Sequence, residues 1–339
     1  MKPPSLSICI PTYNFGRFIG ETLTSIVDQA TEDVEIVVLD GGSTDNTAEV
    51  VERFRNGFPR LRYHRKDKKG GIDRDMAETV GIASGEYCWL FSADDTMESG
   101  AIRDILEQIR EGHDVYLCGL TLCDIKMRPL RQHPVSSAPP GAIFDLSVPK
   151  ERDDYFRQAE TTTAFFSFCS SLIFRKSRWD AIPLDEEFVG SCWAHVARFF
   201  RMIPQGLTVK YLPLPHLRKR GENDSFLDRG IIHRVGIGIA GYHRLANTFF
   251  GKNSDESFHI RRVLRNEYCL AGMLGMKLKA ASGGNREDIE YLDRLVEMLY
   301  LNDLWSNRMH LVVYRLAPVS LLKPADRAYR LLRKFLPLP

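Results

Sequence analysis

The sequence predicts an α/β fold: a doubly wound, mostly parallel sheet flanked by helices, followed by a helical C-terminal extension. In the first hundred residues, short apolar runs alternate with segments of helical periodicity. Three of those apolar runs end in polar clusters, as expected where strands open onto a ligand site. After about Ser225 the pattern changes to long helical segments. We therefore expect a catalytic domain at residues 1–225 and a helical region at residues 226–339.

Each element follows from a local pattern. Apolar runs bounded by turn residues predict buried strands at residues 6–10, 34–39, 61–64 and 87–91. Apolar residues at helical spacing predict helices at residues 18–29, 43–54, 73–83 and 101–109. The segment 127–148, rich in proline and serine, predicts a long surface loop.

Composition excludes several classes of protein. Hydrophobic residues at 44% and charged residues at 27% are typical of a soluble globular chain, and a net charge of +2 does not indicate a nucleic-acid partner. Seven cysteines without a CxxC pair argue against a disulfide framework or a zinc site. The first residues lack a signal-peptide pattern, and no run reaches the roughly 18 apolar residues of a spanning helix. We expect a cytoplasmic protein that is soluble or lies on the inner face of the membrane.

The polar clusters at the strand ends are the candidate ligand site. They are Pro11-Thr12-Tyr13-Asn14, Asp40-Gly41-Gly42-Ser43 and Ser92-Ala93-Asp94-Asp95. Because the carboxyl ends of parallel strands share one edge of a sheet, these clusters should lie together.

Asp94 and Asp95 are adjacent carboxylates after an apolar run. Such a pair suits a hard divalent cation, Mg²⁺ or Mn²⁺, which binds a carboxylate together with substrate phosphates. The alternative is structural: Asp95 would cap a helix starting near Thr96.

Asp40 and the two glycines after it have a similar double interpretation. Gly41 and Gly42 allow a ligand to approach the backbone, and the Asp40 carboxylate can accept hydrogen bonds from a base or ribose. The alternative is an ordinary strand-to-helix turn capped by Ser43 or Asp45, and both interpretations can hold together.

Three stretches of this sequence resemble the family 2 glycosyltransferases of the GT-A fold. They are SICIPTYN at residues 7–14, IVVLDGGSTD at residues 36–45 and GEYCWLFSADD at residues 85–95. Within that family, GGIDRDM at residues 70–76 and YCWLF at residues 87–91 are most similar to the O-antigen abequosyltransferase branch.

The resemblance implies roles for individual residues. The loop from Pro11 to Asn14 and Asp40 would hold the nucleotide, Asp73 and Arg74 would flank its base or diphosphate, and Asp94 would ligate the metal. Two positions depart from the family pattern: Ser92 replaces the first acid of Asp-x-Asp, and Gly41 replaces the second acid of Asp-Asp-Gly-Ser.

The catalytic base is the least determined part of the site. Inverting members of the family usually carry a Glu-Asp pair, which is missing from the matching region at residues 185–195. His195 lies near that position, and with an ordinary pKa it can deprotonate a sugar hydroxyl; alternatively it is a packed helix histidine. Glu187 and Asp95 are the other catalytic candidates, and acids at residues 185–187 can equally form the first turn of a helix.

Two further motifs have competing interpretations. Arg220, in the basic loop at residues 216–225, is a candidate clamp for the donor diphosphate, or part of a solvated turn. The GxGxxG sequence at residues 236–241 does not follow a strand, so we interpret its glycines as close helix packing and not as a dinucleotide site.

The C-terminal segment 307–339 carries seven Lys or Arg and one acid among apolar residues. A basic amphipathic segment can lie on an anionic membrane surface. The alternative is docking on the catalytic domain or on a second subunit.

Taken together, the sequence predicts transfer of a sugar from a nucleotide-diphosphate donor to a glycan acceptor, specifically a polyprenyl-linked O-antigen intermediate. By resemblance the reaction is metal-assisted and inverting. The alternative is a nucleotide-sugar-binding protein without turnover; a nucleotidylyltransferase is disfavoured because residues 11–18 lack a glycine-rich basic loop. No pattern indicates an oligomeric state.

Overall fold

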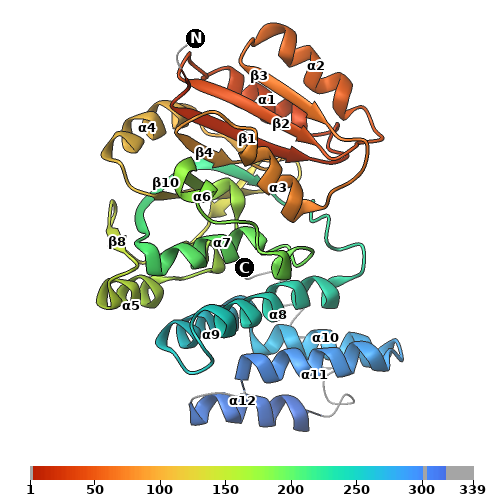
Figure 1. Cartoon of the computed structure of the whole chain (residues 1–339). Helices are drawn as coiled ribbons and strands as arrows, with labels where there is room; N and C mark the ends of the chain where they lie inside the picture. The colour runs from red at the N-terminus through yellow and green to blue at the C-terminus, as the bar shows by residue number, and fades with distance from the viewer. Residues whose placement is uncertain (1–2, 301–303, 318–339) are drawn as a thin grey trace. The chain divides into compact units, whose positions relative to one another are not determined.

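The computed structural model of the chain describes residues 3–300 and 304–317. The chain divides into two compact units, Met1–Asp224 (unit 1) and Ser225–Pro339 (unit 2). Figure 1 shows the chain with labels on its helices and on several of its strands.

Unit 1 is built around one sheet. Its strands are β1 (Leu6–Thr12), β2 (Val34–Asp40), β3 (Leu61–Arg65), β4 (Tyr87–Leu90), β5 (Thr96–Met97), β6 (Val115–Cys123), β7 (Pro129–Gln132), β8 (Ile143–Asp145), β9 (Leu172–Arg175) and β10 (Thr208–Arg220). Its α-helices are α1 (Ile19–Val27), α2 (Thr47–Gly57), α3 (Ile72–Gly81), α4 (Ala101–Gln108), α5 (Pro149–Gln158), α6 (Lys176–Asp180) and α7 (Ala194–Met202). The four strands and four helices predicted within the first 110 residues are confirmed.

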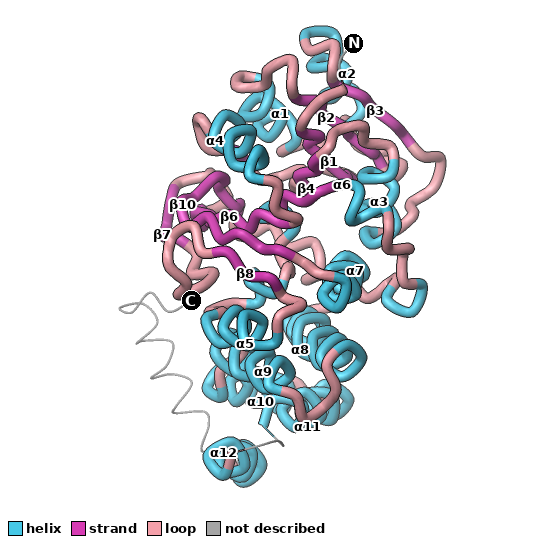
Figure 2. The backbone as a smooth tube through the Cα atoms, turned by 60° about the vertical axis from the view of Figure 1, so that its left-hand side comes forward, coloured by secondary structure: helices cyan, strands magenta, loops and turns pink. Residues whose placement is uncertain are grey.

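The sheet is mixed: one half contains only parallel strand pairs, and the other half contains both parallel and antiparallel pairs. Its order is β3-β2-β1-β4-β9-β6-β10-β5, with β7 and β8 added beside β6 and β10. β1 pairs in parallel with both β2 and β4. β9 runs antiparallel to its neighbours β4 and β6, which closes the purely parallel part. Figure 2 shows these strands as one twisted surface.

Both faces of the parallel half are covered. Every residue of β1 and β2 is buried, so side chains pointing to either face meet protein. α1 packs with α2, whereas α3 and α6 both pack with α7. This is the flanked sheet that the apolar runs predict.

The chain order reverses beside β1. After β1 it moves outward to β2 and β3, and then returns to the other side of β1 as β4. Ligands of open α/β sheets bind at such a switch point, outside the carboxyl ends of the strands. The clusters beginning at Pro11 and Ser92 follow the two strands that form it.

The long loop expected at residues 127–148 is interrupted by two short strands. The segment contains β7 and β8, and α5 follows it. All four residues of β7 are exposed, so the strand lacks the buried alternation by which strands are predicted. β8 has only three residues.

Unit 2 is helical. It contains α8 (Ile231–Phe249), α9 (Asp255–Glu267), α10 (Leu270–Ser282), α11 (Arg286–Tyr300) and α12 (Trp305–Leu316). α11 packs against the four others. The GxGxxG motif lies within α8, where a Cβ on Gly236 or Gly238 would stand 2.1 Å from the hydroxyl of Tyr291 or Tyr268. Its interpretation as close helix packing is confirmed.

Among residues 3–300 and 304–317, no helix has the length and apolar character needed to cross a bilayer.

Candidate active site

The loops after β1 and β2 are hydrogen-bonded to each other. Asn14 adopts a left-handed backbone conformation (φ 59°), and its amide donates to the Ser43 hydroxyl at 2.8 Å. The Asn14 side-chain oxygen accepts from the amide of Thr44, also at 2.8 Å. The first two predicted clusters therefore form one surface.

Asp40 lies at the base of this surface. Its carboxylate is fully buried and accepts hydrogen bonds from the Ser43 amide at 2.7 Å and from the Tyr63 hydroxyl at 2.6 Å. Burial and the Asp40 contact raise the pKa of the Tyr63 phenol. Asp40 thus shapes the turn, as its structural interpretation requires, and its contact with a base or ribose stays a prediction.

Gly41 and Gly42 lie so close to neighbouring protein groups that a larger side chain would not fit at either position. A Cβ on Gly41 would lie 2.9 Å from the Asp75 carboxylate, and Gly42 has a φ of +85° with Lys66 O 3.1 Å from its ideal Cβ. Asp45 binds the start of α2, since its carboxylate accepts from the amide of Thr47 at 3.0 Å, although the N-cap position itself is Asn46.

Two polar groups beside these loops are notable. The Thr12 hydroxyl is buried and has no hydrogen-bond partner, and the Lys69 ammonium stands 4.1 Å from the centre of the Tyr13 ring. Asp75 is buried and receives Lys66 Nζ at 3.2 Å, yet burial raises the pKa of its carboxyl.

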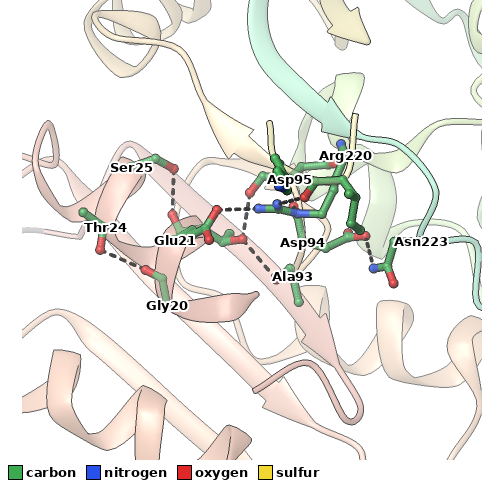
Figure 3. A network of polar contacts seen from close by, with 12 residues as sticks. Gly20, Glu21, Thr24, Ser25, Ala93, Asp94, Asp95, Arg220 and Asn223 are labelled. Carbon is green, nitrogen blue, oxygen red and sulfur yellow. Dashed lines mark hydrogen bonds and ion pairs between the residues drawn. The ribbon is translucent and has the colours of Figure 1, made fainter. Parts of the chain in front are cut away.

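Asp94 follows β4 and forms the third cluster with its neighbours. Its carboxylate accepts from the Ser92 hydroxyl and, at 2.8 Å, from the side-chain amide of Asn223. Figure 3 shows Asn223 and Asp94 facing each other. The Ala93 carbonyl accepts a hydrogen bond from the Thr22 hydroxyl at 3.0 Å.

Asp95 has different surroundings from Asp94. It is 2% exposed, and its two oxygens accept from the Ser170 hydroxyl at 2.7 Å and the Arg220 amide at 3.0 Å. Burial, followed by repulsion from Asp94, raises the pKa of Asp95 to about 7. The expected helix cap is wrong, because Thr96–Met97 forms β5 and α4 begins at Ala101.

Arg220 is buried and directed at protein groups. Its guanidinium donates to the carbonyls of Asp94 and Ile125 at 2.8 and 2.7 Å, and pairs with Glu21 at 2.7 Å (Figure 3). In this structure Arg220 supports the Ser92–Asp95 turn, and the alternative of a solvated turn is wrong for this buried side chain. Its contact with the donor diphosphate stays a prediction.

Asp73 and Arg74 also make protein contacts. Asp73 accepts from the amides of Gly190, Cys192 and Ala194 at 2.8 to 3.0 Å, so it fixes the turn that begins α7. Arg74 forms a bidentate pair with Glu186.

The expectation of an ordinary pKa for His195 is wrong. The side chain is 5% exposed, and burial lowers its pKa. Nε2 lies 3.1 Å from the Phe166 carbonyl, whereas Nδ1 is buried without a partner. Because Nε2 must carry the proton to donate, the free lone pair is on Nδ1. Glu187, by contrast, is exposed.

The residues that the sequence alone did not identify are the supporting ones. Ser170, Glu21 and Asn223 bind the Ser92–Asp95 turn or its Arg220 support. Ser170 could have been identified from the sequence, because a serine inside the apolar run 165–174 needs a buried hydrogen-bond partner.

The atoms around Asp94 suit a hard cation. A carboxylate, the Ser92 hydroxyl and the Asn223 amide are all oxygen-bearing groups of the kind Mg²⁺ and Mn²⁺ prefer. Among the residues that the structure describes, no three His, Cys, Asp or Glu side chains form a metal cluster. A cation bound here would complete its coordination with water or with phosphate oxygens.

The fold and the strand-end loops define an α/β protein whose candidate ligand site lies at a switch point of the sheet. Residues 7–181 match the family model described as Glycosyl transferase family 2, and the chain belongs to this family. It is a glycosyltransferase with a GT-A-like fold.

One relative matches nearly the whole chain, and another matches about half of it. The chain is 31% identical to abequosyltransferase RfbV of Salmonella typhimurium over 329 residues, covering 94% of this chain and 97% of that protein. It is 27% identical to the GalNAc(5)-diNAcBac-PP-undecaprenol beta-1,3-glucosyltransferase of Campylobacter jejuni, covering 56% of this chain and 57% of that one.

Solved structures support the fold. The TarS 1–349 structure of S. aureus in complex with UDP-GlcNAc aligns with a TM-score of 0.61 at 18% identity, covering 96% of this chain and 91% of that one. A mannosyltransferase of Pyrobaculum calidifontis, in complex with GDP-Man and Mn²⁺, aligns with a TM-score of 0.51 at 17% identity, covering 96% and 88%.

Proposed function

We propose that this glycosyltransferase moves a sugar from a nucleotide-diphosphate donor to a hydroxyl of a lipid-linked glycan, with inversion and with a divalent cation at Asp94. The observation that carries the donor site is the convergence of three loops at one switch point: the Asn14 and Ser43 loops are bonded together, and Asp94 follows the adjacent strand.

In this proposal the loops divide the donor between them. Asp40, Gly41 and Gly42, together with the loop from Pro11 to Asn14, receive the base and ribose. Asp94, Ser92 and Asn223 hold the cation, which supplies neutralisation of the charge that develops on the departing diphosphate.

Arg220 and Asp95 position Asp94 in this scheme. Arg220 binds the Asp94 carbonyl, and its backbone amide binds the Asp95 carboxylate, so β10 fixes the metal-binding turn from behind. Asp73 has a similar part at α7, where it orders the turn that precedes His195.

His195 and Glu187 are the candidate bases. His195 has a neutral imidazole with its lone pair on Nδ1, in a fixed orientation, but reaching a hydroxyl requires the site to open. Glu187 is accessible without movement. Substituting each alone, as His195→Asn and Glu187→Gln, separates them: loss of the base lowers kcat by about 10²- to 10⁴-fold, and loss of the other leaves kcat nearly unchanged.

The names of the relatives support the acceptor class. One is named an abequosyltransferase, and the name of another gives an undecaprenol-linked glycan as its substrate. We therefore propose a polyprenyl-linked acceptor and action at the inner face of the cytoplasmic membrane.

Asp94→Asn tests the donor site directly. The substitution should lower transfer by roughly 10²- to 10³-fold, because it removes the charge that holds the cation. Asp114→Asn is the matched control, since Asp114 accepts from Thr208 at the amino end of β6, the opposite edge of the parallel strands. Equal activity of the Asp94→Asn variant and the wild type contradicts the proposal.

A nucleotide-sugar-binding protein without turnover is the second candidate. The engagement of Asp95 and His195 with protein groups favours it, since two of the three catalytic candidates are buried. Under this alternative the wild type binds a nucleotide sugar but neither transfers nor hydrolyses it in the presence of Mn²⁺.

A further inference from the structure

Helix α12 has apolar side chains on two opposite faces. Its inner face buries Leu311 and Tyr314, and α12 packs against α10 and α11. Its outer face exposes four apolar residues, with exposed fractions of 77, 41, 43 and 74%: Trp305, Met309, Val312 and Leu316. We call these four residues the α12 stripe.

The spacing of the stripe makes it one continuous surface. Its members are separated by four, three and four positions, so they fall on one side of the helix, opposite the buried residues. Val313 beside it and Leu304 just before the helix are also exposed, by 48 and 50%. Single exposed apolar residues are ordinary, but a contiguous row with a tryptophan indicates a docking surface.

Charge identifies the kind of partner. Arg308 and Arg315 lie on one flank of the stripe and are exposed. Arg315 pairs with Glu297 of α11 while remaining 57% exposed. Residues 225–339 contain 18 Lys and Arg against 11 Asp and Glu, whereas residues 1–224 contain 28 against 33. The cationic excess therefore belongs to unit 2, the unit that carries the stripe.

We propose that the α12 stripe docks on the surface of an anionic lipid bilayer, with α12 parallel to the membrane plane. A bilayer interface offers both components that the helix requires, an apolar layer for the stripe and anionic headgroups for the flanking arginines. A second copy of the chain fits less well, because pairing through the same stripe would bring two cationic units together. This inference stands independently of the transfer reaction.

Vesicle sedimentation of the full chain tests the proposal. We expect binding to phosphatidylcholine vesicles containing 30% phosphatidylglycerol, and much weaker binding to pure phosphatidylcholine or at 1 M salt. The Trp305→Ser/Leu316→Ser variant should lower the partition coefficient at least tenfold, and Arg308→Glu several-fold, since each cation near such a surface contributes roughly fivefold.

The matched control is Leu130→Ser/Leu214→Ser. These leucines are exposed by 67 and 70%, close to the values for Trp305 and Leu316, but belong to unit 1. The control should bind vesicles like the wild type. Thermal unfolding of each variant confirms that exposed positions were changed without loss of the fold.

Quenching by brominated lipid tests whether the stripe itself enters the interface. The chain has four tryptophans; Trp89 and Trp179 are buried, and Trp193 lies in unit 1. We expect brominated phosphatidylcholine in the anionic vesicles to quench the wild-type fluorescence, and the quenching to be lost in Trp305→Phe.

Three outcomes overturn the proposal. The first is equal vesicle binding by the wild type and the Trp305→Ser/Leu316→Ser variant, which would assign binding to another part of the chain. The second is no vesicle binding by the wild type. The third is a dimer in light scattering that the stripe variant dissociates, with no lipid quenching, which would assign the stripe to a second copy.

Discussion

Asp94 and Asp95 are neighbours in the chain with different environments. Asp94 accepts hydrogen bonds from the Ser92 hydroxyl and the Asn223 side-chain amide, two groups whose oxygens could also bind a cation. Asp95 is enclosed between the Arg220 backbone amide and the Ser170 hydroxyl. Burial, followed by repulsion from Asp94, raises the pKa of Asp95. Environments that differ in this way assign different roles to paired acids: Asp94 is suited to a cation and Asp95 to support.

His133 supplies a residue-scale prediction about pH. Burial lowers its pKa to about 4, while its Nε2 lies 3.0 Å from the Thr163 hydroxyl. An unfolded histidine binds its proton near pH 6.5, so lowering the pH from about 6.5 to 4 favours the unfolded state, by at most about 3 kcal/mol.

Urea unfolding at pH 7 and pH 4.5 measures this effect. Both the wild type and His133→Gln lose stability through their carboxylates, and the wild type should lose more. Equal losses in the two proteins would show that His133 does not contribute.

At this scale the sequence identifies candidate ligand-binding residues more readily than the residues that support them. Asp40 and Asp94 stand out because acids at the ends of apolar runs lie where the ligands of parallel sheets bind. The burial of His195 was not predictable, since it depends on Phe166 approaching from a distant segment. The burial of Arg220 was likewise not predictable, because it depends on the pairing of β10 with β6 and β5.

At the scale of elements, Asp73 joins the start of α3 to the start of α7. Three backbone amides of residues 190–194 donate to one buried carboxylate, and Cys192 among them has a φ of 71°. A left-handed non-glycine residue persists only where its surroundings hold it.

Asp73→Ala should therefore destabilise the protein by about 2 to 4 kcal/mol, because it leaves buried amides unpaired. The control is Glu186→Ala, whose partner Arg74 is about half exposed, and which should cost under about 1 kcal/mol. Chemical denaturation of the two variants compares them; a smaller loss for Asp73→Ala than for Glu186→Ala would exclude the anchoring role.

The glycines of unit 2 give a second element-scale prediction. Gly238→Ala should cost about 1 to 3 kcal/mol, since the new methyl group would meet the Tyr268 hydroxyl. Gly275→Ala in α10 has nothing within 4 Å and should stabilise the protein by up to about 1 kcal/mol. Melting temperatures of the two variants should move in opposite directions, and a shared direction would contradict the packing.

Elements were predictable where burial is periodic or continuous. β1 and β2 are buried throughout, and the sequence therefore shows them as apolar runs. β7 is exposed throughout and α5 buries only Tyr155 and Phe156, so neither leaves a pattern in the sequence. The antiparallel insertion of β9 between β4 and β6 depends on long-range pairing that no local pattern encodes.

At the scale of the whole molecule, chemistry and charge are separated along the chain. The residues proposed to hold the donor lie between Pro11 and Asn223, within unit 1, where acids outnumber bases. The excess of Lys and Arg lies in unit 2. The segment 318–339, which carries much of the predicted basic tail, lies outside the described residues.

The most direct test of the donor site is a thermal-shift screen of the full chain against UDP, CDP, GDP and dTDP, each with and without Mn²⁺. A ligand at a hundred times its Kd stabilises the folded state by about 2.7 kcal/mol, which raises Tm by several degrees. We predict a Mn²⁺-dependent rise for one nucleotide, and its loss in the Asp94→Asn variant but not in Asp114→Asn. No shift with any nucleotide, or an equal shift in the Asp94→Asn variant, would contradict a metal-assisted donor site at the carboxyl end of β4.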